Sequence, residues 1–254
     1  MHILCITNQK GGVGKTTTTI NLGAALADKG LNVLLIDFDP QGHLTEGFGV
    51  HKEYTQASPN LYELLLGEVK GKISNLAIEV ENLKLIPSHV RLFLAEQTLV
   101  LQRGRELKLR RLLDEIPSEF DWVLIDCPPS LGLLTDNAIY ASRQVLVPIQ
   151  AEDTSIRALE ILLDQIYSLE EALRVEVKVL GILPNMVEDT KLAKGILKSL
   201  RESLPITFPF EVRKRVKLKE AWAQGQSIFK YDPKSDLIQV YAMLADELIK
   251  RMEK

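Results

Sequence analysis

The stretch Lys10-Gly11-Gly12-Val13-Gly14-Lys15-Thr16-Thr17 decides the expected fold. A short apolar run before it predicts a strand over 2–7, and the run after it predicts a helix over 16–29. Glycines let the backbone curl so that its N–H groups point inward, and the N-terminus of the following helix favours negative charge. The stretch therefore predicts a phosphate-binding loop in which Lys15 reaches the β- and γ-phosphates of a nucleotide and the Thr16 hydroxyl binds Mg²⁺.

Short apolar runs alternate with amphipathic stretches along the rest of the chain. Strands are expected at 2–7, 33–37, 83–87, 121–126, 144–149 and 177–184, and helices at 16–29, 92–116, 133–142, 153–172, 188–203 and 235–252. Continuously apolar strands separated by helices are typical of a parallel sheet covered on both faces. We therefore predict an α/β fold with a doubly wound, mostly parallel sheet, of the P-loop NTPase kind, in a single domain over residues 1–254.

The composition is that of an ordinary globular protein, with 46% hydrophobic and 26% charged residues in a chain of 254. No apolar run reaches the roughly 18 residues of a membrane span, and the N-terminus does not read as a signal peptide. Cys5 and Cys127 lie in separate apolar runs and are expected to be buried free thiols. These observations favour a cytoplasmic protein and exclude a disulfide scaffold.

Charge is distributed unevenly along the chain. Residues 191–219 hold nine basic residues and two acidic ones, a formal charge of +7, whereas the whole chain carries −3. The other residues therefore carry −10. Such an asymmetry permits an anionic partner that the total charge does not suggest.

Two further apolar runs end in carboxylates. One run leads into Asp37 and, two residues on, Asp39, and the other leads into Asp126. Ligands bind at the carboxyl edge of a parallel sheet, so these side chains are expected near the phosphate loop. Asp126 fits a Walker B position that holds Mg²⁺ through a water, since Mg²⁺ keeps several waters.

These motifs together resemble the ParA/MinD family of deviant Walker ATPases over nearly the whole chain. Where the usual phosphate-loop consensus opens with glycine, this chain has Gln9, and the next residue, Lys10, matches the family's signature lysine. The segment from Asp37 through Pro40 to Gly42 resembles the family's switch I, and the segment from Asp126 to Gly132 resembles its Walker B and switch II.

The resemblance implies roles for these residues. Two subunits of the family enclose two ATP molecules, so Lys10 is expected to act on the ATP of the opposite subunit, as an arginine finger does. Lys15 and Asp39 complete the implied catalytic set, with Asp39 positioning the attacking water. The implied metal site consists of Thr16, Asp37 and Asp126, with Asp37 supporting the metal and phosphate shell.

The base and DNA contacts are also implied by resemblance. Asn185, at the end of an apolar run, is expected to contact adenine, with a turn-forming role as the alternative. Arg213 and Arg215 fall at the outer positions of a loop that lines adenine in relatives, although this chain departs from the family's Pro-Arg-Asn pattern there. Duplex DNA is expected to bind without sequence preference, and the alternative is a solvated charged face. The implied DNA-binding residues are Arg201, Arg213, Lys214, Arg215 and Lys217. Reversing the charge of the last four is expected to leave ATP binding intact, because the phosphate loop lies elsewhere in sequence.

The family reading further implies an ATP-bound homodimer, a ParB-like centromere-binding partner that stimulates hydrolysis, and a nucleoid-associated location in the cytoplasm. The chain starts at its first expected strand, which suggests the short, Soj-like type. A MinD-like membrane regulator would end in a basic amphipathic anchor, whereas the residues after Ala245 mix acidic and basic side chains. A metabolic synthetase of the same fold usually lacks an equivalent of Lys10. An iron–sulfur carrier needs paired cysteines, and a tyrosine kinase of this fold needs a tyrosine-rich tail.

Overall fold

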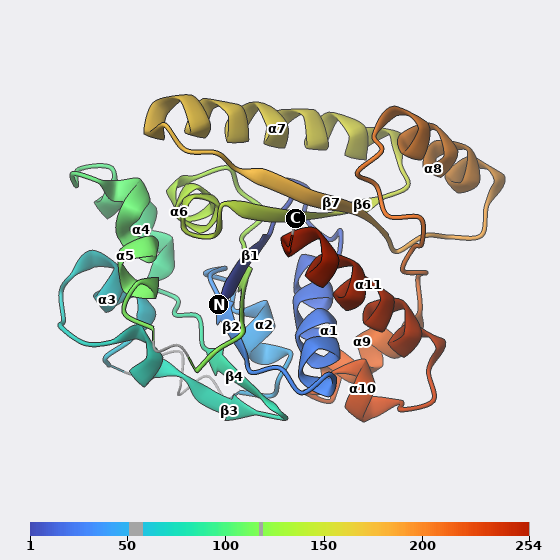
Figure 1. Ribbon diagram of the computed structural model, residues 1–254. Coiled ribbons are helices and arrows are strands. Elements are labelled where there is room, and N and C mark those ends of the chain that lie inside the picture. Colours follow the sequence, from blue (N-terminus) through green and yellow to red (C-terminus); the bar gives the residue numbers. More distant parts are fainter. Residues whose placement is uncertain (51–57, 117–118, 254) are drawn as a thin grey trace.

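The sheet has seven strands and lies between two layers of helices (Figure 1). The computed structural model describes residues 1–50, 58–116 and 119–253. The strands are β1 (His2–Ile6), β2 (Val33–Asp37), β3 (Ile78–Val80), β4 (Leu83–Ile86), β5 (Trp122–Asp126), β6 (Gln144–Gln150) and β7 (Lys178–Asn185). Their order is β3-β4-β2-β5-β1-β6-β7, with β3 antiparallel to β4 and the other pairs parallel. The predicted doubly wound, mostly parallel α/β fold is confirmed.

Alternation along the central strands explains the two layers. In β5, Val123 and Ile125 point into one hydrophobic cluster, and Trp122 and Leu124 point into the other. Both sets are fully or almost fully buried, as expected when helices cover both faces of a parallel sheet.

Different helices supply the two layers. The first cluster is covered by α3 (Leu61–Leu66), α4 (Leu92–Leu99), α5 (Lys108–Leu113), α6 (Leu133–Ser142) and α7 (Asp153–Leu173). The second is covered by α1 (Lys15–Asp28), α2 (His43–Glu46), α9 (Val216–Ala223), α10 (Ile228–Tyr231) and α11 (Asp236–Met252). The remaining helix α8 (Lys191–Ser203) lies beyond the carboxyl end of β7 in Figure 1. Two short 3₁₀ turns complete the described elements, η2 (Ile73–Leu76) and η3 (Arg105–Leu107).

The long helix predicted over 92–116 is wrong. The chain forms α4, the 3₁₀ turn η3 and then α5, and Gly104 between them adopts the left-handed conformation with φ of 61°. Glycine reaches this region without steric cost, and the helix cannot continue through it. The basic stretch from Arg103 to Arg111 therefore does not form one outer helical face.

Smaller differences concern short elements. Sequence patterns did not predict β3, which is only three residues long, or the short helices α2, α3, α9 and α10. The helix expected from 188 begins at Lys191, because the Thr190 side chain caps it by accepting a hydrogen bond of 3.1 Å from the Ala193 backbone N–H. Within the described residues, no helix combines the length and the apolar character that a membrane span requires.

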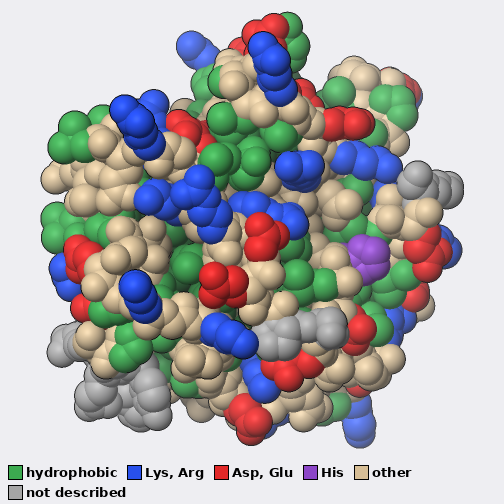
Figure 2. Space-filling view, turned by 60° about the vertical axis from the view of Figure 1, so that its left-hand side comes forward, with side chains coloured by type: hydrophobic (Ala, Val, Ile, Leu, Met, Phe, Trp, Pro, Cys, Tyr) green, Lys and Arg blue, Asp and Glu red, His purple; other side chains and the backbone are tan. Residues whose placement is uncertain are grey.

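One helix leaves large apolar side chains uncovered. The exposed residues on α4 and beside it are Val90, Phe93, Leu94, Val100 and Leu101, which we call the α4 apolar face. Figure 2 brings the α3–α5 side of the molecule forward and shows hydrophobic groups there among Lys and Arg side chains. A group of exposed apolar side chains on one helix marks an interaction site more often than an isolated exposed residue does.

The central strand predicts where the fold is most sensitive. Leu124→Ala should lower the free energy of unfolding by about 2–5 kcal/mol, because it removes a fully buried side chain from the cluster between β5 and α1. Leu192→Ala, at a side chain 69% exposed on α8, is the matched control and should change it by less than about 0.5 kcal/mol. Urea denaturation measures both, and equal effects would contradict the assigned core.

Candidate functional site

The phosphate loop connects β1 to α1 at the carboxyl edge of the sheet. Gly12 and Gly14 have φ of 75° and 86°, and Gly14 is the N-cap of α1. The Asn185 side chain, from the end of β7, donates hydrogen bonds to the Val13 carbonyl at 3.0 Å and to Thr18 Oγ1 at 3.3 Å. A Cβ added at Gly14 would lie 2.4 Å from the Asn185 amide nitrogen. Position 14 therefore requires glycine for its backbone angle and for space.

Asn185 consequently has a role that its sequence position did not suggest. Its side chain is 1% exposed, and its Oδ1 accepts a hydrogen bond of 2.8 Å from the Met186 N–H. Both ends of the amide are thus engaged within the chain. The structure supports bracing of the phosphate loop by Asn185, and its contact with adenine stays a prediction.

Asp126 lies at the centre of the polar groups below the loop. Its carboxylate is buried and accepts hydrogen bonds from Thr16 Oγ1 at 2.7 Å and Thr19 Oγ1 at 3.2 Å. Burial raises the pKa of Asp126 to about 7, against the lowering effects of the Thr16 hydrogen bond and the Lys15 charge. Lys15 is itself buried, which lowers its pKa although Asp126 and Asp39 act in the opposite direction. The Lys15 ammonium donates to the Lys10 carbonyl at 3.3 Å.

Asp37 pairs directly with Asp126 in the register of β2 and β5. Its Oδ2 accepts from the Thr45 N–H at 2.8 Å and the Thr45 hydroxyl at 2.6 Å, and its Oδ1 accepts from the Asp39 N–H at 3.2 Å. Burial, followed by the charge of Asp126, raises the pKa of Asp37 well above its ordinary value. Asp37 is thus held from α2 and from the backbone, and its place in the metal site stays a prediction.

The residues present fit a magnesium ion. Thr16 and Asp126 place a hydroxyl and a carboxylate oxygen together beside a buried second carboxylate, and a cation would compensate this concentration of negative charge. Mg²⁺ usually takes one or two protein oxygens and completes its shell with water and substrate phosphates. Within the described residues, no group of three or more His, Cys, Asp or Glu side chains is placed to hold a metal ion.

Asp39 lies on the cavity side of the same edge. Its Oδ1 accepts a hydrogen bond of 2.9 Å from the Gln41 N–H, and its backbone carbonyl accepts from the Ser88 hydroxyl at 2.5 Å. The segment after Asp37 is thus tied both to α2 and to the chain that follows β4. Asp39 lines the same cavity as the phosphate loop.

The Lys10 ammonium points away from its own phosphate loop. It pairs with Glu152 and donates hydrogen bonds to the hydroxyls of Thr154 at 3.1 Å and Ser155 at 3.4 Å, all at the start of α7. Its side chain is 25% exposed. The Lys10 ammonium is therefore held by side chains at the start of α7, whereas the Lys15 ammonium contacts the loop backbone.

A cavity of about 690 Å³ extends from the phosphate loop to α9. One wall contains Gly11, Gly12, Gly14, Lys15, Thr16 and Thr17, and Asp39 and Asn185 also line the cavity. The opposite wall contains Met186, Leu218, Lys219, Trp222 and Ala223. A polar end with backbone N–H groups and an apolar end suit a phosphorylated ligand that carries a flat base.

The basic segment contributes to this cavity, which corrects one expectation. Arg213, Lys214 and Arg215 line the same cavity as the phosphate loop. These residues are far from the phosphate loop in sequence but close to it in space. Reversing their charge is therefore expected to disturb nucleotide binding as well as DNA binding. Lys217 lies outside the lining.

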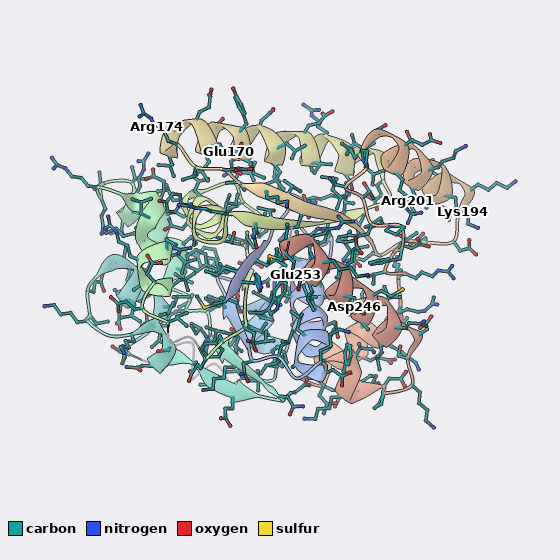
Figure 3. All side chains as sticks on the ribbon, viewed as in Figure 1. Glu170, Arg174, Lys194, Arg201, Asp246 and Glu253 are labelled. Atoms are coloured by element: carbon teal, nitrogen blue, oxygen red, sulfur yellow. The ribbon has the colours of Figure 1, made fainter. Side chains whose placement is uncertain are left out.

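Acidic residues from other elements offset much of the +7 charge. Lys214 pairs with Glu188 at 2.6 Å, Arg215 pairs with Asp236 at 3.0 Å, and Lys217 pairs with Asp232. Arg201 on α8 donates to the Phe208 carbonyl at 3.2 Å and pairs with Glu211 at 2.9 Å, so it joins α8 to the loop after it (Figure 3). The predicted set is therefore not one free basic surface, and Arg201 has a structural use.

Sequence reasoning missed several residues of the site. Trp222, Leu218 and Met186 form the apolar end, Glu152 holds Lys10, and Ser88 holds the Asp39 segment. No spacing rule connects these residues to the motifs, because each arrives from a different element. One signal could have pointed to Trp222, because a large aromatic residue stands there close to a run of basic residues.

Comparison with known proteins gives three findings. A family model described as an AAA domain matches residues 1–179. The chain is 39% identical over 248 residues to the sporulation initiation inhibitor protein Soj of Bacillus subtilis, covering 97% of each chain. It is 38% identical over 252 residues to the chromosome partitioning protein ParA of Myxococcus xanthus, covering 98% of this chain and 88% of the relative.

A solved structure shares the fold over the whole chain. Cobyrinic acid a,c-diamide synthase from Mycobacterium smegmatis with bound ATP analogue and magnesium matches with a TM-score of 0.85 and 32% identity. The match covers 100% of this chain and 96% of that one.

Asn185→Ala separates bracing of the loop from contact with the base. Because the side chain holds the Val13 carbonyl, its loss should weaken ATP and inorganic triphosphate binding by similar factors, roughly fivefold for one or two neutral hydrogen bonds. Calorimetric titration of both ligands measures this. Weaker ATP binding with unchanged triphosphate binding would instead establish the adenine contact.

Proposed function

Because the chain belongs to the family of Soj/ParA partition ATPases, we propose that it is an Mg²⁺-dependent ATPase whose ATP-bound dimer acts in the segregation of chromosomal or plasmid DNA. The observation that carries this proposal is Lys10, which lies beside the phosphate loop with its ammonium turned toward Glu152 instead of its own site. The function rests on three parts, which are the nucleotide site, the dimer and the DNA-binding surface.

The nucleotide site has the groups that phosphoryl transfer requires. The loop N–H groups and Lys15 would hold the β- and γ-phosphates, and the apolar end beside α9 would hold the base. Thr16 and Asp126 would hold Mg²⁺, which neutralises charge on the phosphates when bound. Asp39 would orient the attacking water, because it lines the same cavity as the loop.

Dimerisation gives Lys10 its function. Its ion pair with Glu152 is partly exposed, and pairs of this kind contribute only about 0–1 kcal/mol. A second subunit that brings its nucleotide to this edge can therefore draw the ammonium away from Glu152. In that position Lys10 would neutralise charge that develops on the transferred phosphoryl group.

The α4 apolar face supports an interaction on this side of the molecule. It follows the Ser88 segment that holds Asp39, and a Cβ added at Gly132, in the switch II segment, would lie 2.0 Å from a Glu96 carboxylate oxygen. Helix α4, which carries this face, thus packs against the switch II segment through Glu96. Its burial in a dimer would add a hydrophobic contribution to the nucleotide contacts.

DNA binding is proposed for the part of the basic segment outside the cavity. Lys191 and Lys217 are exposed, and neither lines the nucleotide site. The Lys217 ion pair with Asp232 is exposed and weak enough for a phosphate to replace it. Pairing two subunits would double the phosphates neutralised and steepen the salt dependence.

The proposed partner is a ParB-like centromere-binding protein that stimulates hydrolysis, and the proposed location is the nucleoid. Turnover without that partner should be well below the roughly 1–10³ per second of metabolic enzymes. The similarity to cobyrinic acid a,c-diamide synthase makes a metabolic synthetase the second candidate, and fast turnover that depends on a small metabolite would favour it. A MinD-like anchor at α11 is disfavoured, because Leu237, Tyr241 and Leu248 are buried in the core.

Two lysine variants test the dimer mechanism. Lys15→Ala should abolish nucleotide binding, whereas Lys10→Ala should bind ATP with affinity within about threefold of wild type but neither dimerise nor hydrolyse it. Asp39→Ala, which blocks hydrolysis, should sediment as a dimer with ATP and Mg²⁺. Analytical ultracentrifugation and phosphate release measure these properties. Wild-type turnover by Lys10→Ala would refute the mechanism.

A charge-reversal pair tests the DNA surface. In the Asp39→Ala background, Lys191→Glu with Lys217→Glu should weaken duplex binding by at least roughly tenfold at low salt and leave ATP affinity unchanged. Arg103→Glu with Arg111→Glu, at exposed positions outside the segment, is the matched control. Gel shifts with scrambled duplexes, ATP and ADP give the readout. Binding to anionic liposomes and not to DNA would favour the membrane-regulator alternative.

A further inference from the structure

Helix α9, which forms the apolar wall of the cavity, is fastened to α2 by Trp222. The indole N–H of Trp222 donates a hydrogen bond of 3.0 Å to the His43 carbonyl at the start of α2. Both Trp222 and His43 also line the cavity. One side chain therefore touches the ligand space and the helix that follows the Asp39 segment.

The two segments fit together closely enough to exclude added atoms. A Cβ at Gly47, just after α2, would lie 2.6 Å from atoms of the Trp222 ring and 2.7 Å from Ile20. Beyond α9, a Cβ at Gly225 would lie 2.9 Å from the Gly49 backbone nitrogen. Because backbone and ring meet without intervening space, movement of α9 must be accompanied by movement of α2.

Helix α2 in turn holds the Asp37 carboxylate, and its N-cap residue Gly42 holds the backbone of Asp39. Thr45 donates two hydrogen bonds to Asp37, and the Gly42 N–H donates to the Asp39 carbonyl at 2.9 Å. The contacts therefore run without a gap from Trp222 through His43 and Gly47 to Thr45, and from there to Asp37. This is a contiguous path from the apolar end of the cavity to the groups beside the phosphates.

We propose that Trp222 is a positioning residue that couples a purine base in the apolar end of the cavity to the placement of the Asp39 segment. This inference rests on the proposed ATPase function. A base that packs against α9 fixes the Trp222 ring, and the ring fixes α2 and with it the Asp39 segment. Base binding then acts on the rate of hydrolysis and not only on affinity.

Two simpler roles give different kinetics. If Trp222 only stacked on the base, its replacement would raise KM and leave kcat unchanged. If it only filled space, its replacement would lower thermal stability and affect both constants through unfolding. Coupling predicts a fall in kcat at saturating ATP in a protein that keeps its affinity and its melting temperature.

Intrinsic fluorescence tests the first half of the coupling in the wild-type protein. The chain has two tryptophans, and Trp122 is 2% exposed in the core of β5. ATP should change the tryptophan emission, whereas inorganic triphosphate, which has no base, should bind without this change. Trp222→Phe should lose the ATP-induced change, which assigns it to Trp222. An equal response to triphosphate, in a protein that binds and hydrolyses ATP, overturns the coupling and leaves the proposed function intact.

Single-turnover hydrolysis tests the second half of the coupling, from Trp222 to the Asp39 segment. Trp222→Phe keeps a ring against Gly47 but lacks the donor to His43, so its rate at saturating ATP should fall roughly two- to tenfold, the range that one neutral hydrogen bond spans. Its ATP affinity should stay within twofold. Gly47→Ala, which disturbs the same contact from α2, should show the same pattern, with melting temperatures confirming that both variants fold.

Leu218→Ala is the matched comparison on the same wall of α9. Its side chain lines the cavity, and the contacts described for Trp222 with α2 do not involve it, so it should weaken ATP binding with little change in kcat. If Trp222→Phe and Leu218→Ala both change only affinity, the stacking role replaces the proposal. If no ATP binds to the wild-type protein, the proposed function itself fails.

Discussion

The buried carboxylate of Asp126 is the constraint on which the rest of the site depends. A carboxylate removed from water is costly unless hydrogen bonds or a cation compensate it. Here Thr16 and Thr19, both on the first turns of α1, supply two hydrogen bonds. This requirement fixes where α1 begins relative to β5, and the glycines before α1 must then curl to connect it to β1. The contacts of Thr16 and Thr19 with Asp126 thus position the phosphate loop relative to the sheet.

Motifs that are continuous in sequence were predictable for a physical reason. The loop residues from Gly11 to Thr17 adopt their conformation through backbone angles that glycine permits and through one adjacent helix. Asp37 and Asp126 end parallel neighbouring strands, so topology alone brings them together. The interruption between α4 and α5 could not be predicted from hydrophobic periodicity. A single glycine such as Gly104 is tolerated within a helix, and the sequence does not show that its φ is 61° here.

Contacts between distant elements were beyond sequence reasoning. The +7 count for 191–219 was correct as arithmetic, but Glu188, Asp232 and Asp236 lie outside that window and pair with its lysines and arginines. Likewise, Asn185 was expected to read a base because an amide offers a donor and an acceptor. The fold brings β7 beside the loop, where the amide donates to the Val13 carbonyl, and its contact with adenine stays a prediction. In both cases the residue type indicated which interactions the side chain can make, but the sequence did not show which residue it would contact.

The two ends of the cavity differ in how firmly they are held, and this difference suits a switch. At the base end, Trp222, Gly47 and the Gly49–Gly225 contact leave no room for independent movement. At the phosphate end, Lys10 is held by side chains at the start of α7, where Glu152 is 56% exposed. Exposed ion pairs are weak, while charge-assisted hydrogen bonds to phosphate in a site closed from water are stronger. In the proposed mechanism, the rigid end beside α9 transmits nucleotide occupancy to the Asp39 segment, and the loosely held Lys10 exchanges its partner when a second subunit approaches.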